Sequence, residues 1–387
     1  MTFKKINTAS IKKPEWTDLC FGVLTIGSIS LHWLVLAIAP IALYRKLFFG
    51  KLRSISSIES KIIMINLLAL MYACYVIAER GAIETNAQFI LQSLYSVIAP
   101  IIIITYRPDN KTVDTLNLGC LILLIVDFSV NATSFYLGHD LFGRELDLRD
   151  GITGGARFGG AFGHSFVSGI ISVCALAYSL SSRRWVFVVL SLFNLTIAGS
   201  FRNLVPLVGL PIFYFSRKRI SRLGWLLTLL SLSALAITSV ILTSSYVPSS
   251  FPFNPASDLR IFSWEFGLSR MFDHPFVGSG WPITNELKAV NEEIIESNLI
   301  TESWFLTNAV AFGIPFMLLK FYSLYSVVSS YLPRIVTPMF ACIGPITIID
   351  LFYGQNIDQI LYCNLFWAVA IASIARKNMP CHSAKNG

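Results

Sequence analysis

Long apolar runs separated by short polar or basic segments dominate the chain. The first extends from about residue 16 to 49, and the others lie near 62–78, 88–105, 117–137, 164–180, 185–199, 203–216, 223–243, 304–331, 335–352 and 359–375. Because a helix needs about 20 apolar residues to cross a bilayer, the pattern predicts an all-α integral membrane protein. Several runs are shorter than that, and Pro206, Pro211 and Pro315 predict broken or tilted helices.

The first run has two interpretations that differ in topology. As one span it places Arg45, Lys46 and the basic residues up to Lys61 outside the membrane. As a hairpin of two spans it returns them to the cytoplasm, beside the N-terminal lysines. Cationic side chains collect on the cytoplasmic side, so the charge pattern favours the hairpin. We therefore expect about 12 transmembrane helices (11 if the run is a single span), with both termini cytoplasmic.

This topology leaves two sizeable loops outside, at 138–163 and 244–303. The second has about 60 residues, far more than an ordinary connection, and loops of that length are usually functional. The chain shows no internal repeat. Residues 1–387 are expected to form a single polytopic membrane domain whose working face carries these two loops.

Composition agrees with this class of protein. The chain is 54% hydrophobic and 13% charged, and its mean hydropathy is +0.64. Basic loops beside an anionic leaflet explain the net charge of +8, so no nucleic-acid partner is expected. The cysteines lie in apolar runs or the C-terminal tail, which predicts no disulfides. No CxxC or HExxH spacing occurs, so neither a metal site nor a redox site is predicted.

The first outer loop ends in the glycine-rich segment GITGGARFGGAFGHSF, immediately before a predicted span. Glycines let a backbone approach a ligand closely, and a helix N-terminus offers free N–H groups to a phosphate. Arg157 adds a planar fork of donors that suits phosphate oxygens. The alternative is that the glycines serve only turns and tight helix packing.

Arg202 interrupts two short apolar runs in AGSFRNLVP, at the outer surface. It either extends to lipid headgroups or, with Ser200 and Asn203 beside it, supplies donors to a site.

The long loop contains PASDLRIFSWEFGLSRMFDHPFVGSGW. Arg260, Trp264 and Trp281 combine a cation with flat aromatic faces, as a site for sugar rings and a phosphate requires. HPFVGSGW is typical of a turn that returns the chain. His274 is a candidate base, or it only caps that turn. Arg270 is interpreted as a solvated loop charge.

The segment LITESWFLTNAVAFGIPF places Glu302 at the outer mouth of a span. Its carboxylate is either a general base for an attacking hydroxyl or a partner of the helix dipole. Asp127 lies deep in an apolar run, with Asn131 and Ser134 at i+4 and i+7. Intramembrane acids usually face the bundle interior. Both a structural hydrogen bond and a role in substrate passage remain open for Asp127.

These segments, in this order and on this side of the membrane, resemble the O-antigen ligase and polysaccharide polymerase superfamily over roughly residues 150–320. The matching positions lie in four elements: ARFGGAF (Arg157, Gly160, Phe162), GSFRN (Ser200 and Arg202, with Phe201 inserted between them), Arg260 with Trp264 followed by HPFVGSG, and ESWFL (Glu302 to Leu306) followed by Gly313 and Ile314. Glu302 stands where ligases have histidine, which is more similar to the polymerase branch of the Wzy type. His164 and Ser165 replace the Pro-Asn that commonly follows the first arginine. His164 is therefore either a substrate contact or part of a helix start.

The resemblance implies an inverting glycosyl transfer at the periplasmic face of a bacterial inner membrane, without metal or other cofactor. The donor would be a growing glycan on undecaprenyl pyrophosphate, and the acceptor a single lipid-linked repeat unit. Arg157, Arg202 and Arg260 would stabilise the pyrophosphate leaving group, and Glu302 would deprotonate or orient the acceptor hydroxyl. A chain-length regulator is the implied protein partner. The alternatives are a ligase that transfers glycan to lipid A core and a lipid-linked oligosaccharide flippase or other transporter.

Overall fold

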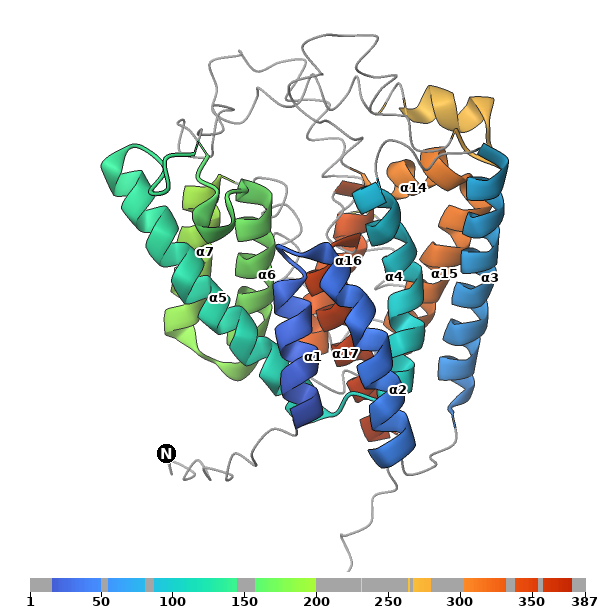
Figure 1. Ribbon diagram of the computed structural model, residues 1–387, viewed down its shortest axis with the longest axis horizontal. Helices are drawn as coiled ribbons and strands as arrows, with labels where there is room; N and C mark the ends of the chain where they lie inside the picture. Colours follow the sequence, from blue (N-terminus) through green and yellow to red (C-terminus); the bar gives the residue numbers. More distant parts are fainter. Residues whose placement is uncertain are drawn as a thin grey trace, which may run out of the picture.

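Helices make up most of the part of the chain that the computed structural model describes, which is residues 16–49, 55–80, 87–144, 157–199, 231, 264, 267–279, 303–331, 338–353 and 358–377. The helices form one bundle (Figure 1). In chain order they are α1 (Trp16–Gly27), η1 (His32–Ala37), α2 (Ile38–Phe49), α3 (Ser57–Arg80), α4 (Ala87–Tyr106), α5 (Asn110–Leu137), η2 (Gly160–Phe162), α6 (Ser165–Ser182), α7 (Trp185–Ala198), α14 (Trp304–Phe312), α15 (Ile314–Tyr331), α16 (Pro338–Tyr353) and α17 (Ile360–Lys377).

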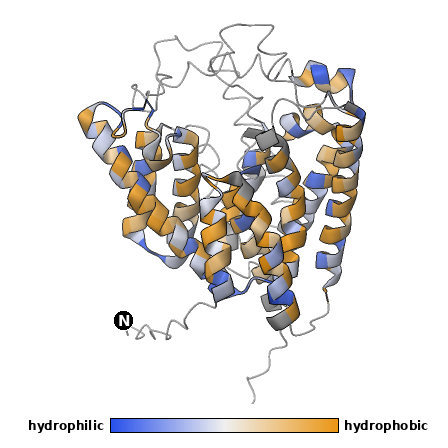
Figure 2. Ribbon diagram, viewed as in Figure 1, coloured by the Kyte–Doolittle hydropathy of each residue, from blue (hydrophilic) through white to orange (hydrophobic). Residues whose placement is uncertain are grey.

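The surface of this bundle is apolar where a soluble protein would be polar. Of the described helices, α3, α5 and α6 are long and apolar enough to cross a membrane, and several shorter apolar helices accompany them. Large hydrophobic side chains on the outer faces of α3, α5 and α7 are exposed, among them Met64, Met71, Ile122, Val186 and Phe193. Figure 2 shows that hydrophobic residues dominate the middle of these helices. An exposed apolar belt of this kind indicates a multi-pass membrane protein.

Polar side chains in the interior join neighbouring helices. Asn66 of α3 donates to Ser323 of α15 at 2.7 Å. Tyr95 of α4 donates to Asn364 of α17 at 2.6 Å, and Asn364 donates in turn to Thr25 of α1 at 3.1 Å. Because every buried polar group needs a partner, these bonds fix the rotation of the helices they connect. α17 lies at the centre, since its residues from Ile360 to Ser373 are all buried.

The first helices form a short hairpin rather than two full spans. α1 and α2 have 12 residues each, a length of about 18 Å, against about 30 Å for a hydrocarbon core. They run antiparallel, since Arg45 near the end of α2 donates to Asp18 in the first turn of α1. In Figure 1 the hairpin occupies only the lower half of the bundle. The chain thus returns to the end where it began, as the hairpin interpretation requires, without crossing the full thickness.

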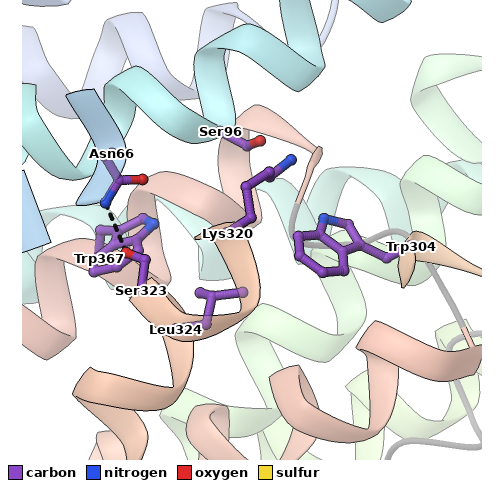
Figure 3. Close-up of a pocket in the computed structure, with 7 residues that line it drawn as sticks. All are labelled: Asn66, Ser96, Trp304, Lys320, Ser323, Leu324 and Trp367. Atoms are coloured by element: carbon purple, nitrogen blue, oxygen red, sulfur yellow. Dashed lines mark hydrogen bonds between the residues drawn. The ribbon is translucent and has the colours of Figure 1, made fainter. Parts of the chain in front are cut away.

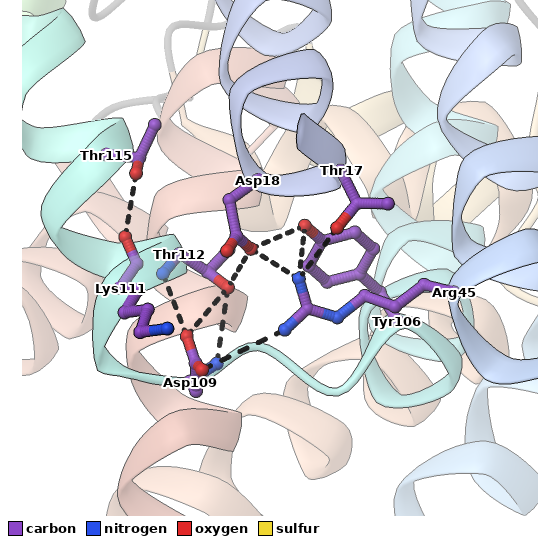
Figure 4. Close-up of polar contacts among 8 residues, drawn as sticks. All are labelled: Thr17, Asp18, Arg45, Tyr106, Asp109, Lys111, Thr112 and Thr115. Atoms are coloured by element: carbon purple, nitrogen blue, oxygen red, sulfur yellow. Dashed lines mark hydrogen bonds and ion pairs between the residues drawn. The ribbon is translucent and has the colours of Figure 1, made fainter. Parts of the chain in front are cut away.

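A buried ion pair holds this hairpin against α4 and α5. Arg45 Nη1 lies 2.5 Å from Asp18 Oδ1. The hydroxyls of Tyr106 and Thr112 donate to the same carboxylate oxygen at 2.7 and 2.6 Å (Figure 4). Asp109 caps α5 by accepting from the Thr112 N–H. Four helix ends therefore meet at one charged cluster on the lower end of the bundle.

One predicted apolar run proves to be two helices. The run at 304–331 divides into α14 and α15 at Gly313, whose φ of 89° ends the first helix. Pro315 was expected to break or tilt a helix, and the run is broken just before it: Pro315 occupies the second position of α15, where its missing N–H costs no helical hydrogen bond. α14 and α15 are therefore two separate helices, with α14 at the upper end of the bundle (Figure 1).

Candidate functional site

The glycine-rich segment joins the upper ends of α5 and α6. Arg157 begins the described part of this segment and is half-buried. Gly160 opens the short helix η2, and Gly163 closes it with a φ of 73°. His164 then starts α6 through its backbone: its N–H donates to the Gly159 carbonyl at 3.0 Å, and its carbonyl accepts from Val167. The side chain of His164 is exposed and does not cap the helix.

Asp127 anchors this segment from inside the bundle. Its side chain is fully buried in α5, and its Oδ1 accepts from the Ala161 N–H at 2.9 Å and from Ser168 at 3.1 Å. Its Oδ2 accepts from Asn194 at 2.8 Å and from Asn131 at 3.3 Å. One carboxylate therefore ties α5, α6, α7 and the loop together, which is the structural role that the sequence left open for Asp127.

Gly160 is required by this anchoring. Its φ is 58°, and a Cβ at this position would lie 2.6 Å from Ser168 Oγ and even closer to the Asp127 carboxylate. The packing interpretation of the glycines therefore holds at Gly160. A substrate contact by Gly160 stays a prediction, since any such contact would have to be made by its backbone.

Arg144 holds the same loop from the outer side. It forms a two-pronged pair with Asp140, with N–O distances of 3.0 and 2.9 Å, and it also donates to the Gly160 carbonyl. Donation by the Arg144 guanidinium lowers the pKa of Asp140 below its ordinary value. We did not single out Arg144 from the sequence, although it is one of the cations in the outer loop.

Residues His274 to Ser279, the described part of the HPFVGSG segment, form a turn that packs onto the junction between α14 and α15. The Ser279 N–H donates to the Val310 carbonyl at 2.7 Å, and the Ile314 N–H donates to the Pro275 carbonyl at 2.8 Å. Gly278 has a φ of 67°, and a Cβ there would meet the Ala311 carbonyl oxygen at 2.6 Å. The predicted turn is therefore present. His274 belongs to it, with its carbonyl accepting from the Gly278 N–H at 2.9 Å.

Trp264 lies against the same helix. Its half-buried side chain packs on a hydrophobic cluster of Met271 and Met317 with residues of α14: Leu306, Ala309 and Val310. The segment that carries the third motif is thus in contact with α14, which begins two residues after Glu302. Two motifs that are about 40 residues apart in the chain are brought together here.

A buried cation lies beneath α14. The Lys320 ammonium in α15 is 3.1 Å from Asp358 Oδ1 and 2.9 Å from Asn308 Oδ1. Asp358 also accepts from Trp304 Nε1 at 3.0 Å and from Asn308 at 3.4 Å. The Lys320 ammonium lies 4.9 Å from the centre of the Trp304 indole ring, which is a cation–π distance.

A small cavity adjoins Lys320 (Figure 3). It measures about 10 Å³, about the space that one water molecule needs. The residues that line it come from α3, α4, α14, α15 and α17: Asn66, Ser96, Trp304, Lys320, Ser323, Leu324 and Trp367. The indole N–H of Trp367 is buried and has no hydrogen-bond partner among the described residues. A water molecule in the cavity would satisfy this donor.

Lys320 and Asp358 were not among the site residues predicted from the sequence. A signal was present, since Lys320 is a cation inside an apolar run, and charged groups at such positions usually face the bundle interior. Its partners come from two other segments: Trp304 and Asn308 lie in α14, and Asp358 lies just before α17. Only the folded chain reveals that they meet.

Four predicted site residues, Arg202, Arg260, Trp281 and Glu302, lie outside the described residues. The described ones fall in two groups at the upper end of the bundle: Arg157, Gly160 and His164 between α5 and α6, and Trp264 with His274 over α14 and α15 (Figure 1). Within the described part of the chain, no group of three His, Cys, Asp or Glu side chains is arranged to hold a metal ion.

Comparison with known proteins identifies no family for the chain. No protein-family model matches the chain, and no curated protein matches it at a significant level. The all-helical fold and its exposed apolar belt indicate the class, a multi-pass membrane protein.

Proposed function

We propose that this protein is an O-antigen or polysaccharide polymerase of the bacterial inner membrane. It joins undecaprenyl-pyrophosphate-linked repeat units at the periplasmic face. Both termini are cytoplasmic, and about 12 helices lie in the membrane. The observation that carries the proposal is the placement of the described motif segments: the ARFGGAF loop, the Trp264 segment and the start of α14 all lie at the upper end of one bundle.

The distribution of charge supports this orientation of the bundle in the membrane. Arg45, Arg107 and Lys111, together with Arg183 and Arg184 in the turn between α6 and α7, lie at the lower end of the bundle. Cationic residues favour the cytoplasmic side, so the upper end with its motif segments is assigned to the periplasm.

The proposed reaction is an inverting glycosyl transfer. The acceptor hydroxyl oxygen bonds to the anomeric carbon of the donor glycan while the bond from that carbon to the pyrophosphate oxygen breaks. Undecaprenyl pyrophosphate leaves with the bonding electrons, and the configuration at carbon inverts. Arg157, Arg202 and Arg260 provide preorganised positive charge for the leaving group. Glu302 takes the hydroxyl proton. Trp264 and Trp281 present flat faces to sugar rings, and the exposed His164 and half-buried His274 flank the site.

The test is the glycan ladder of cells that lack this gene, complemented with the wild type, with Arg260→Ala or with Arg260→Lys. We expect Arg260→Ala to leave one repeat unit on lipid A core and to remove the longer bands, because the pyrophosphate loses its bidentate partner. Arg260→Lys should restore little, since lysine cannot form the planar fork. Full activity of Arg260→Lys would contradict the bidentate role. Bare core with long chains on undecaprenyl pyrophosphate would indicate a ligase instead.

The buried Lys320–Asp358 pair favours a second candidate, a lipid-linked oligosaccharide transporter. Charged pairs inside membrane helices often mark substrate or proton pathways. The same gel separates the two functions, because loss of a flippase leaves bare core with single units trapped on the cytoplasmic side. The pair contacts Trp304 and Asn308 of α14, the helix that carries the last motif, and this favours the polymerase.

A further inference from the structure

A short helix at residues 267–273 lies at the upper end of the bundle (gold in Figure 1). It belongs to the long loop that the sequence places outside the membrane. One of its apolar side chains, Met271, is buried in the cluster with Leu306 of α14 and Met317 of α15. Two others stay uncovered, since Leu268 is 45% exposed and Phe272 is 70% exposed.

The polar side chains of this helix lie on a different face. Successive residues of a helix are rotated by about 100°, so Leu268 and Phe272, four positions apart, share one face. Ser269, Arg270 and Asp273 lie on the other side, and Ser269 and Asp273 are exposed. An exposed apolar face opposite a polar face is the pattern of a helix that lies in the plane of a membrane interface.

Phe276 extends the apolar face into the turn that follows the helix. It is 71% exposed, and its carbonyl accepts a hydrogen bond from the Tyr72 hydroxyl of α3. Tyr72 lies eight residues before Arg80, the last residue of α3, which is about 12 Å along the helix axis. The hydrogen bond therefore places Phe276 against the side of α3 and not above its end.

This side of α3 carries a stripe of exposed apolar side chains. Met64, Leu68, Met71 and Tyr75 are all exposed and recur every three or four positions, so they follow one another along one face of the helix. The rings of Tyr75 and Tyr72 are 6.3 Å apart, and tyrosine is enriched where the bilayer meets water. The apolar face of residues 268–276 thus continues the lipid-facing surface of α3 at the level of the interface.

We propose that residues 268–276 anchor the outer loop in the membrane interface, with Leu268, Phe272 and Phe276 inserted among the lipids of the upper leaflet. The partner is the phospholipid surface itself, because the exposed face is continuous with the apolar belt of the bundle and its polar face is turned away from that belt. The anchor fixes the height of the turn that packs onto the junction of α14 and α15. The inference requires only that the bundle spans a bilayer, and it does not depend on the proposed glycosyl transfer.

The test is photocrosslinking of the purified protein in nanodiscs of phosphatidylethanolamine and phosphatidylglycerol. The probe p-benzoylphenylalanine, which reacts with nearby C–H bonds under ultraviolet light, takes the place of Phe272 in one protein and of Phe276 in another. Mass spectrometry then measures the fraction of protein that carries a phospholipid. We expect both positions to give lipid adducts as abundant as those from the same probe at Met71, in the exposed stripe of α3.

The matched control places the probe at Asp273, which adjoins Phe272 in the same helix, is also exposed and lies on the polar face. It should give several-fold fewer lipid adducts than the probe at Phe272, because its side chain is directed into water. Equal yields at the two positions would overturn the inference, since lipid would then reach the helix without regard to its faces. Crosslinks from Phe272 to another segment of the chain would also overturn it, as would crosslinks to a second protein when the same variant is irradiated in cells.

A second measurement needs no probe. Amide hydrogen exchange in the same nanodiscs compares the wild type with a variant that combines Phe272→Ser and Phe276→Ser. We expect exchange of residues 267–276 to become several-fold faster in this variant, with the protection of the buried helix α17 unchanged, because the helix loses its hold on the lipid. Ser269→Ala on the polar face should leave exchange of the segment at the wild-type rate. Wild-type exchange in the doubly substituted protein would contradict the anchor.

Discussion

At the scale of single residues, Gly160 shows how one position serves the ARFGGAF loop. Its positive φ and its contact with the Asp127 carboxylate leave no room for a side chain. The sequence predicted that this loop contains the glycines of a site, and it also allowed that the glycines serve packing. The packing role is the one observed at Gly160. The sequence could not decide this, because Asp127 lies 33 positions away on α5.

Gly160→Ala should destabilise the folded protein more than Gly138→Ala does. Both positions have positive φ, at 58° and 72°, which costs a residue other than glycine about 1–3 kcal/mol. Only at Gly160 does the added Cβ meet other atoms, since nothing lies within 4 Å of a Cβ at Gly138. We expect an additional loss of about 1–3 kcal/mol from this overlap. Thermal unfolding of the purified variants measures it, and equal losses would contradict the tight packing of the loop.

At the scale of elements, the boundaries of two helices follow the predicted apolar runs closely. The run predicted at 164–180 appears as α6 at Ser165–Ser182, and the run at 185–199 as α7 at Trp185–Ala198. Pro315 indicated a break in the run at 304–331, but the position of the break at Gly313 depends on the turn from His274 to Ser279 that packs against it. A contact between segments more than 30 residues apart leaves no local pattern in the sequence.

The connection between α5 and α6 should weaken in acid through Asp140. Arg144 lowers the pKa of Asp140, so the folded state holds its proton less tightly than the unfolded state does. The stabilisation is then complete above the ordinary aspartate pKa of about 3.9 and is lost as the pH falls through the lowered native value. The difference in melting temperature between wild type and Arg144→Met should be constant from neutral pH to about pH 5 and shrink below about pH 4.

The double-mutant cycle supplies the control for this pH effect. In an Asp140→Asn background, the effect of Arg144→Met should not depend on pH, and it should remain above zero because Arg144 also binds the Gly160 carbonyl. A pH dependence that persists in that background would assign the titration to another group.

At the scale of the whole molecule, the all-helical class and the approximate positions of the described helices could be predicted from hydropathy, and most polar contacts between helices could not. The apolar runs predict an all-helical membrane protein, and the structure has three long apolar helices with several shorter ones beside them. The N-terminal hairpin is shorter than two spans, because the run between residues 16 and 49 must also contain η1 and the turns on both sides of it. Lys320 and Asp358 were missed because a charge cluster becomes visible only after distant helices pack.

The central claim is that the upper end of this bundle forms glycosidic bonds between lipid-linked repeat units. The most direct measurement supplies the purified wild-type protein in nanodiscs with those units as the only glycan and follows the products by mass spectrometry. We expect a ladder of products that differ by one repeat unit, with one undecaprenyl pyrophosphate released for each bond formed. Unchanged single units with no lipid pyrophosphate released, from protein that remains folded, would contradict it.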